Sequence, residues 1–195
     1  MASKKPTKDS RKPATEFRRY GLLLVPNFSL IALAAVVDPL RLANGVLGRK
    51  VYEYVTLGTA TEPVASSDGI RVLPDLALSD SGHLDAAFVI GSNPIPKRGI
   101  GEISNWLRRQ SSRGVVLGGV DTGSFFLAHA GLLDGYRCTI HWEDRDFLLE
   151  HFPGLVVSHH LVEIDRDRFT CSGGVSPLDM MTMLLSRPPG SRELV

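Results

Sequence analysis

The chain contains a turn of the form Gly-x-Asp-x-Gly between an apolar strand-like run and a helix-like run. The turn is Gly119-Val120-Asp121-Thr122-Gly123, preceded by residues 115–117 and followed by residues 124–128. Between a strand and a helix, a Gly-x-nucleophile-x-Gly turn is a nucleophile elbow, whose glycines permit a tight bend and whose central side chain enters a pocket. The motif predicts a strand–elbow–helix unit of an α/β fold. Asp121 stands where such elbows normally carry Ser or Cys.

Apolar runs typical of buried strands alternate with segments of helical periodicity along the whole chain. The predicted strands are residues 20–25, 52–57, 86–90, 115–117, 156 and 161–164, with a hairpin at 64–73, and the predicted helices are 30–44, 103–110, 123–130, 143–152 and 177–185. This alternation predicts a mostly parallel sheet covered on both faces by helices. Ligands bind beyond the carboxyl ends of such strands, so the loops at 26–29, 91–93 and 119–122 should meet.

Composition excludes several classes of protein. The chain has 195 residues, 43% of them hydrophobic, and a net charge of +1, which fits one globular domain without an overall nucleic-acid-binding charge. No secretory signal is present and no run approaches the about 18 apolar residues of a membrane span, so we expect a cytoplasmic protein without a membrane partner. Cys138 and Cys171 have neither metal-type nor disulfide-framework spacing, and we expect no metal and no cofactor.

The two ends of the chain differ from its middle. Residues 1–19 are rich in Lys and Arg, which predicts a disordered basic tail, with a DNA-contacting arm as the alternative. Residues 188–195 begin with Pro-Pro-Gly, which is typical of a linker. We therefore expect the ordered domain to span residues 20–187.

Three blocks of residues together resemble a known superfamily. They are Gly119–Gly123, the Leu-Ala-His-Ala-Gly-Leu-Leu-Asp-Gly block at 127–135, and Thr139-Ile140-His141-Trp142. The blocks are similar to the PfpI-like (class I glutamine-amidotransferase-like) superfamily, and more closely to the amidase-like sensor domain at the N-terminus of certain AraC-family transcription regulators. Residues 38–44 and 170–175 agree with that resemblance. It implies a flavodoxin-like three-layer α/β sandwich that is usually a homodimer.

The resemblance also implies a function. Such domains sense a small-molecule effector for a regulator, and relatives respond to small nitrogen compounds such as betaines, carnitine or arginine. We expect DNA to be contacted only through a C-terminal helix-turn-helix domain absent from this sequence, of which residues 188–195 would begin the linker.

The chain departs from the enzymatic pattern of the superfamily at two places. Catalytic members carry Cys at the elbow, where Asp121 stands here, and many carry an acidic residue after the first strand, where Asn27, Phe28 and Ser29 stand here. We therefore expect no catalytic residues and a non-catalytic relative of the cysteine hydrolases. Two alternatives remain: a hydrolase with Asp121 as nucleophile and His141 or His129 as base, and a dimerisation module with a vestigial pocket.

A sensor pocket at the elbow has a predictable chemistry. Ionised Asp121 would attract a cationic amine, and Phe28 and Trp142 would offer aromatic faces to it. The alternative for Asp121 is a helix N-cap, and the alternative for Trp142 is packing in the core or a dimer interface. The ligand's own carboxylate would meet backbone N–H groups near Gly91 and Thr122. The expected ligand-binding residues are Asp121, Thr122, Asn93, Gly91, Phe28, Ser29, His141 and Trp142.

Overall fold

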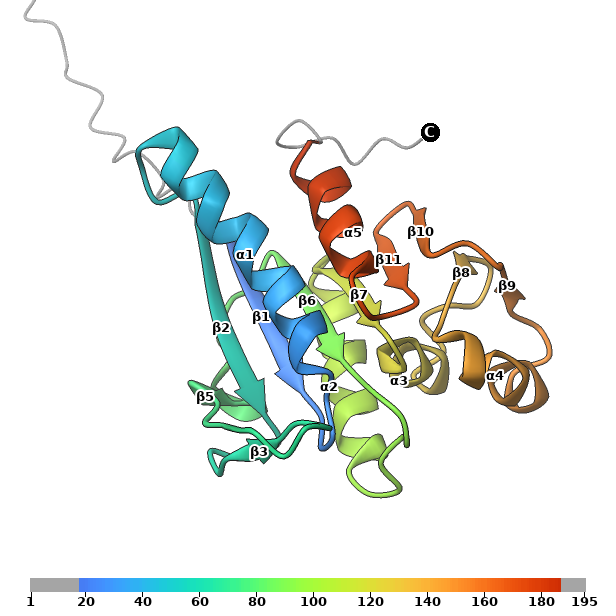
Figure 1. The fold of residues 1–195 in the computed structure, drawn as a ribbon. Helices are drawn as coiled ribbons and strands as arrows, with labels where there is room; N and C mark the ends of the chain where they lie inside the picture. The colour runs from blue at the N-terminus through green and yellow to red at the C-terminus, as the bar shows by residue number, and fades with distance from the viewer. Residues whose placement is uncertain (1–17, 187–195) are drawn as a thin grey trace, which may run out of the picture.

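A seven-stranded sheet organises the chain. The computed structural model describes residues 18–186, and the strand order is β10-β11-β7-β6-β1-β2-β5, with β10 and β11 antiparallel and every other pair parallel (Figure 1). These strands are β1 (Arg18–Leu24), β2 (Tyr52–Gly58), β5 (Leu76–Ala77), β6 (Ala86–Ile90), β7 (Val116–Val120), β10 (Val162–Asp165) and β11 (Arg168–Cys171). The predicted mostly parallel α/β fold is confirmed.

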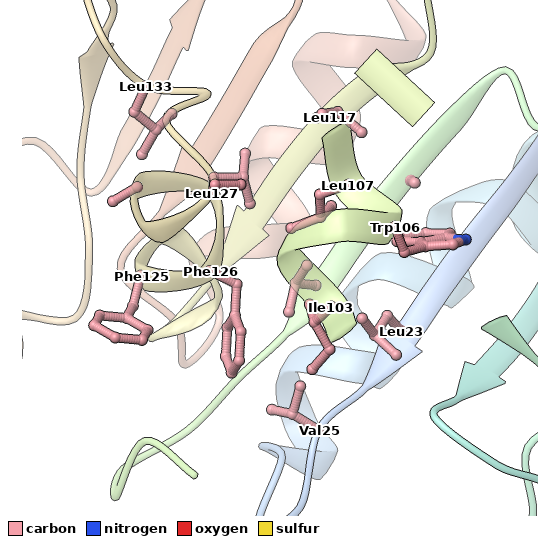
Figure 2. Packing of buried hydrophobic residues seen from close by; sticks show 14 of the residues in the cluster. Leu23, Val25, Ile103, Trp106, Leu107, Leu117, Phe125, Phe126, Leu127 and Leu133 are labelled. Atoms are coloured by element: carbon pink, nitrogen blue, oxygen red, sulfur yellow. The ribbon is translucent and has the colours of Figure 1, made fainter. Parts of the chain in front are cut away.

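Helices cover both faces of the sheet. Successive residues of β1 point to opposite faces, so Leu22 and Leu23 belong to two different core clusters. Leu22 packs on the side of α1 (Leu30–Leu47) and α5 (Ser176–Leu185), which lie next to each other in Figure 1. Leu23 packs on the side of α2 (Ile100–Ser112) and α3 (Gly123–His129), whose buried residues Trp106 and Phe126 appear with it in Figure 2. The result is the expected three-layer sandwich.

The first helix is longer than the sequence pattern predicts. Ser29 caps α1 by accepting the backbone N–H of Ala32, and Gly48, with a φ of +62°, ends it. The helix continues through Gly45, beyond its predicted end at residue 44. By length and composition the helix could cross a membrane, contrary to the expectation that no apolar run approaches a membrane span. Because Val36 and Leu40 are fully buried in the core, α1 is a helix that covers the sheet.

The smaller elements lie at the periphery of the sheet. The predicted hairpin is confirmed as an antiparallel pair, and a second short pair is parallel. These elements are β3 (Val64–Ala65), β4 (Arg71–Val72), β8 (Arg137–Cys138), β9 (Val156–Val157), the 3-10 helices η1 (Leu78–Asp80) and η2 (Trp142–Asp144), and α4 (Arg145–His151).

Two sequence expectations about strands are wrong. Arg18 and Arg19, assigned to the basic tail, form the start of β1. Residues 168–171 lie in none of the predicted strands but form β11, and Arg168 is buried with 4% of its surface exposed. The rest of the predicted tail (1–17) and the predicted linker (188–195) lie outside the described residues.

Candidate functional site

The elbow between β7 and α3 has the geometry that its motif predicts. Asp121 adopts a φ of +60°, a left-handed conformation that is rare for a residue with a side chain. Gly119 is needed because a Cβ there would lie 2.5 Å from the backbone nitrogen of Ser124. Gly123 is needed because a Cβ there would meet the carbonyl of Val89 on β6. The strained turn therefore depends on close backbone approaches that only glycine permits.

The three predicted strand-end loops meet at this elbow. The N–H of Ser29 donates to the carbonyl of Gly91, and the N–H of Gly91 donates to the carbonyl of Val120. The hydroxyl of Thr122 donates to the carbonyl of Ser92 at 2.9 Å. Hydrogen bonds thus hold the carboxyl ends of β1, β6 and β7 together around the elbow.

The carboxyl group of Asp121 lies under the backbone of Gly173. Asp121 is only 6% exposed, and a Cβ on Gly173 would lie 2.6 Å from its Cγ atom. Burial raises the pKa of Asp121 to about 6, against the opposing effects of His141 and of the Thr122 backbone N–H. The segment before α5, part of the 170–175 block that agrees with the resemblance, therefore packs against Asp121.

The N-cap interpretation of Asp121 is wrong by one residue. The N-cap of α3 is Thr122, and its side chain makes no capping hydrogen bond. Asp121 precedes the cap, and the Thr122 N–H lowers its pKa without offsetting the effect of burial. Whether Asp121 contacts a ligand stays a prediction.

A second acidic group, which sequence reasoning missed, faces the elbow. The Oδ2 atom of Asp144 lies 3.7 Å from Nδ1 of His141, and Oε2 of Glu143 lies 3.9 Å from the same nitrogen. Both Nδ1 of His141 and Oδ2 of Asp144 are buried and make no hydrogen bond among the described residues. Burial also raises the pKa of Asp144. Asp144 follows His141 by three residues, and in a turn this spacing brings the two side chains together. The sequence could have identified Asp144 from this spacing.

Several predicted ligand contacts are already occupied or buried. Phe28 has no exposed surface and packs in the core beside α1, so it presents no aromatic face to a ligand. The Ser29 hydroxyl caps α1. The N–H of Gly91 donates within the protein, as described above, and is not free for a ligand carboxylate. The hydroxyl of Thr122 also donates within the protein, whereas the expected contact of its backbone N–H with a ligand stays a prediction.

Trp142 and Asn93 are the predicted residues that remain accessible. Trp142 is 73% exposed, and its ring centroid lies 5.8 Å from that of His141. Packing of Trp142 in the core of this chain is thereby excluded. Asn93 is exposed in the loop after β6 and makes no hydrogen bond within residues 18–186. One aromatic and one amide side chain among the predicted contacts are therefore exposed.

The two cysteines have no part in a reactive site. Cys138 and Cys171 are fully buried, and burial raises their thiol pKa values to about 11 and about 12. A thiolate nucleophile requires a lowered pKa and access to substrate. Within the described part of the chain, no three His, Cys, Asp or Glu side chains are arranged to hold a metal ion.

Known proteins that are similar to this chain in sequence include both transcription regulators and an enzyme. The model of the DJ-1/PfpI family matches residues 28–187. The HTH-type transcriptional regulator GbdR of Pseudomonas aeruginosa is 44% identical over 174 residues, covering 89% of this chain and 47% of GbdR. The isonitrile hydratase of Pseudomonas putida is 29% identical over 165 residues, covering 84% of this chain and 69% of the enzyme.

A solved structure agrees with the regulators. The crystal structure of an AraC family transcriptional regulator from Pseudomonas putida has a TM-score of 0.81 and 28% identity, covering 89% of this chain and 94% of that one. This chain spans about half the length of GbdR. The curated regulators therefore contain a further portion that the comparison does not reach.

Proposed function

Because this chain belongs to the DJ-1/PfpI family, we propose that it is the ligand-sensing domain of an AraC-type transcription regulator and does not catalyse a reaction. The observation that carries the proposal is the buried carboxyl group of Asp121 at the elbow. A thiol cannot act there, and the two cysteines elsewhere are buried with raised pKa values. An elbow that keeps its walls without a thiol is suited to binding without reaction.

The charges around the elbow support a cationic ligand. Three carboxyl groups, on Asp121, Glu143 and Asp144, surround one imidazole, on His141. An ionised carboxylate that is buried without a counter-charge costs free energy, which a bound cation offsets. The exposed indole of Trp142 supplies an aromatic face for a quaternary ammonium or guanidinium group. We propose a small amine-containing metabolite of the betaine, carnitine or arginine type.

Calorimetry on the 195-residue chain tests this proposal. Glycine betaine, carnitine, choline and arginine would be titrated separately, and at least one should bind. Asp121→Asn keeps the shape of the side chain and removes its charge, so it should weaken binding at least about tenfold. Asp146→Asn is the matched control, because Asp146 is 99% exposed on α4. Unchanged binding by Asp121→Asn would contradict the charge pairing, and no binding by any of the four would contradict the ligand class.

One observation favours a hydrolase as the second candidate. The φ of +60° at Asp121 is the strained conformation that presents a nucleophile at an elbow. With an ester substrate, a carboxylate nucleophile would attack the acyl carbon, release the alcohol and form an acid anhydride, which water then cleaves at the Asp121 carboxyl carbon. Turnover in ¹⁸O-water would then place ¹⁸O in Asp121. We expect no such label after incubation with betaine and carnitine esters, and its appearance would favour the hydrolase.

The proposal extends to partners. We propose a homodimer, which sedimentation would detect as a species of twice the chain mass of 21.3 kDa. DNA recognition is assigned to a separate portion of a longer regulator, in line with the half-length match to GbdR. The chain alone should therefore not shift promoter DNA specifically.

A further inference from the structure

A cavity lies at the opposite end of the sheet from Asp121. Its volume is about 430 Å³, within the usual range for small-molecule sites. It is bounded by residues 78, 79 and 81–83, which precede β6, and by the second half of α2 with Arg113, which precede β7. These segments meet the amino ends of the strands, whereas Asp121 follows a carboxyl end. The two sites therefore share no residue.

The lining of this cavity is basic. Arg109 lies in the last turn of α2 and Arg113 is the residue that caps it. Because they are four residues apart, their side chains lie on the same side of the helix end, and both line the cavity. His83 lies on the other wall, and no Asp or Glu lines the cavity. Neither guanidinium makes a hydrogen bond or an ion pair with residues 18–186. The nearest acidic partner of His83 is Asp85, at 3.5 Å, and Asp85 also accepts the backbone N–H of Arg19.

A buried amide adds hydrogen-bonding capacity to this wall. Gln110 lines the cavity, is 2% exposed, and its Oε1 atom makes no hydrogen bond among the described residues. A rotation of the amide by 180° exchanges its oxygen and nitrogen, so Gln110 can present either a donor or an acceptor. Ser81, which accepts the indole N–H of Trp106 at 3.2 Å, keeps its own hydroxyl proton for another acceptor.

We propose that this cavity is a second ligand site, which binds the carboxylate or phosphate group of a small metabolite. Guanidinium groups bind both kinds of oxyanion through paired N–H donors, and two of them here lack a counter-charge. Gln110 and Ser81 supply the neutral hydrogen bonds that fix the orientation of the ligand. Because Arg108 of α2 donates to the carbonyl of Ala130, just after α3, the helix that lines the cavity also supports the elbow helix.

Titration of the 195-residue chain with succinate and with inorganic phosphate, at constant ionic strength, tests the site. Arg109→Ala combined with Arg113→Ala should weaken binding of the anion at least tenfold. Lys97→Ala combined with Arg98→Ala removes the same charge from exposed residues outside the cavity and should leave binding unchanged. Binding of succinate alone identifies a carboxylate site, and binding of phosphate alone identifies a phosphate site. If neither anion binds, or if both double variants weaken binding equally, the proposal is overturned.

A single substitution distinguishes ligand binding from a structural role of the buried amide. Gln110→Met has similar length and no polar group, so it should not lower the melting temperature of the free chain. It should weaken binding of the anion severalfold, because the neutral hydrogen bond is lost. Unchanged binding by Gln110→Met would remove Gln110 from the site.

Discussion

At the scale of single residues, protonation of Asp121 makes the stability of the folded chain depend on pH. Its pKa is about 6 in the folded chain and about 4 when exposed, so between these values the folded chain holds a proton that the unfolded chain has released. Stability therefore falls as pH rises from 4 to 6, by at most about 3 kcal/mol. In urea denaturation, Asp121→Asn should gain stability relative to the unmodified chain across this range. A constant difference between the two proteins from pH 4 to 7 would contradict the raised pKa.

Gly173 is the residue on which the position of Asp121 depends. A Cβ there would collide with the Asp121 carboxyl group, and the φ of +87° adds backbone strain. Gly173→Ala should destabilise the chain by about 1–3 kcal/mol and abolish binding at the elbow. Gly174→Ala is the control, because it also has a positive φ, of +59°, but has nothing within 4 Å. Equal effects of the two substitutions on ligand affinity would show that contact with Asp121 is unimportant.

Residues of the candidate site that belong to a sequence motif were predictable, whereas those brought there by contacts between distant segments were not. Asp121 and His141 lie in recognisable blocks, so the sequence identifies them. Gly173 meets Asp121 only because β11 pairs with β7, a contact between distant segments that no local pattern encodes. Phe28 was misjudged for the same reason, since an aromatic side chain after a strand is equally suited to a pocket or to the core, and only the packing of α1 decides.

At the scale of elements, long strands and helices with regular periodicity were predictable, whereas β11 was not. The strand has only four residues, so its alternation of polar Arg168 and Thr170 with apolar Phe169 and Cys171 is too short to distinguish it from a turn. The sheet nevertheless buries this arginine, whose Nε donates to the carbonyl of Leu132 at 2.9 Å. One terminal nitrogen donates to the hydroxyl of Ser111 at 3.0 Å, and the other lies 2.8 Å from Oδ2 of Asp167.

Arg168 should consequently support the junction of β11 with the α2–β7 connection. Arg168→Ala leaves the carbonyl of Leu132 without its donor and removes the ion pair with the half-exposed Asp167, so we expect a loss of about 1–3 kcal/mol in free energy of unfolding. Arg166→Ala, in the same hairpin and exposed, should cost less than about 1 kcal/mol. Chemical denaturation of both variants measures the difference. If the two variants lost similar free energies of unfolding, the contacts of Arg168 would contribute no more to stability than those of an exposed arginine.

At the scale of the whole molecule, the alternation of strands and helices predicted both the layers and the edge of the sheet that carries the elbow. The order of the strands was not predictable, because pairing of β7 with β11 instead of a sequence neighbour depends on how the last third of the chain folds back. The same limit concealed the basic cavity, whose walls come from segments about 30 residues apart that meet only at the amino ends of β6 and β7.

Binding at the elbow should be visible in the stability of the entire domain. A ligand that binds only the folded chain adds about 2.7 kcal/mol to the free energy of unfolding when its concentration is about 100 times its Kd. For a domain of this size, that raises the melting temperature by about 5–10 °C. Since a cationic ligand requires ionised Asp121 and the pKa is about 6, its affinity should fall about tenfold between pH 7 and pH 5. The thermal shift at fixed ligand concentration should shrink accordingly, and it should be small and independent of pH in Asp121→Asn. A thermal shift of the unmodified chain that is as large at pH 5 as at pH 7 would mean that the ligand does not depend on this carboxylate.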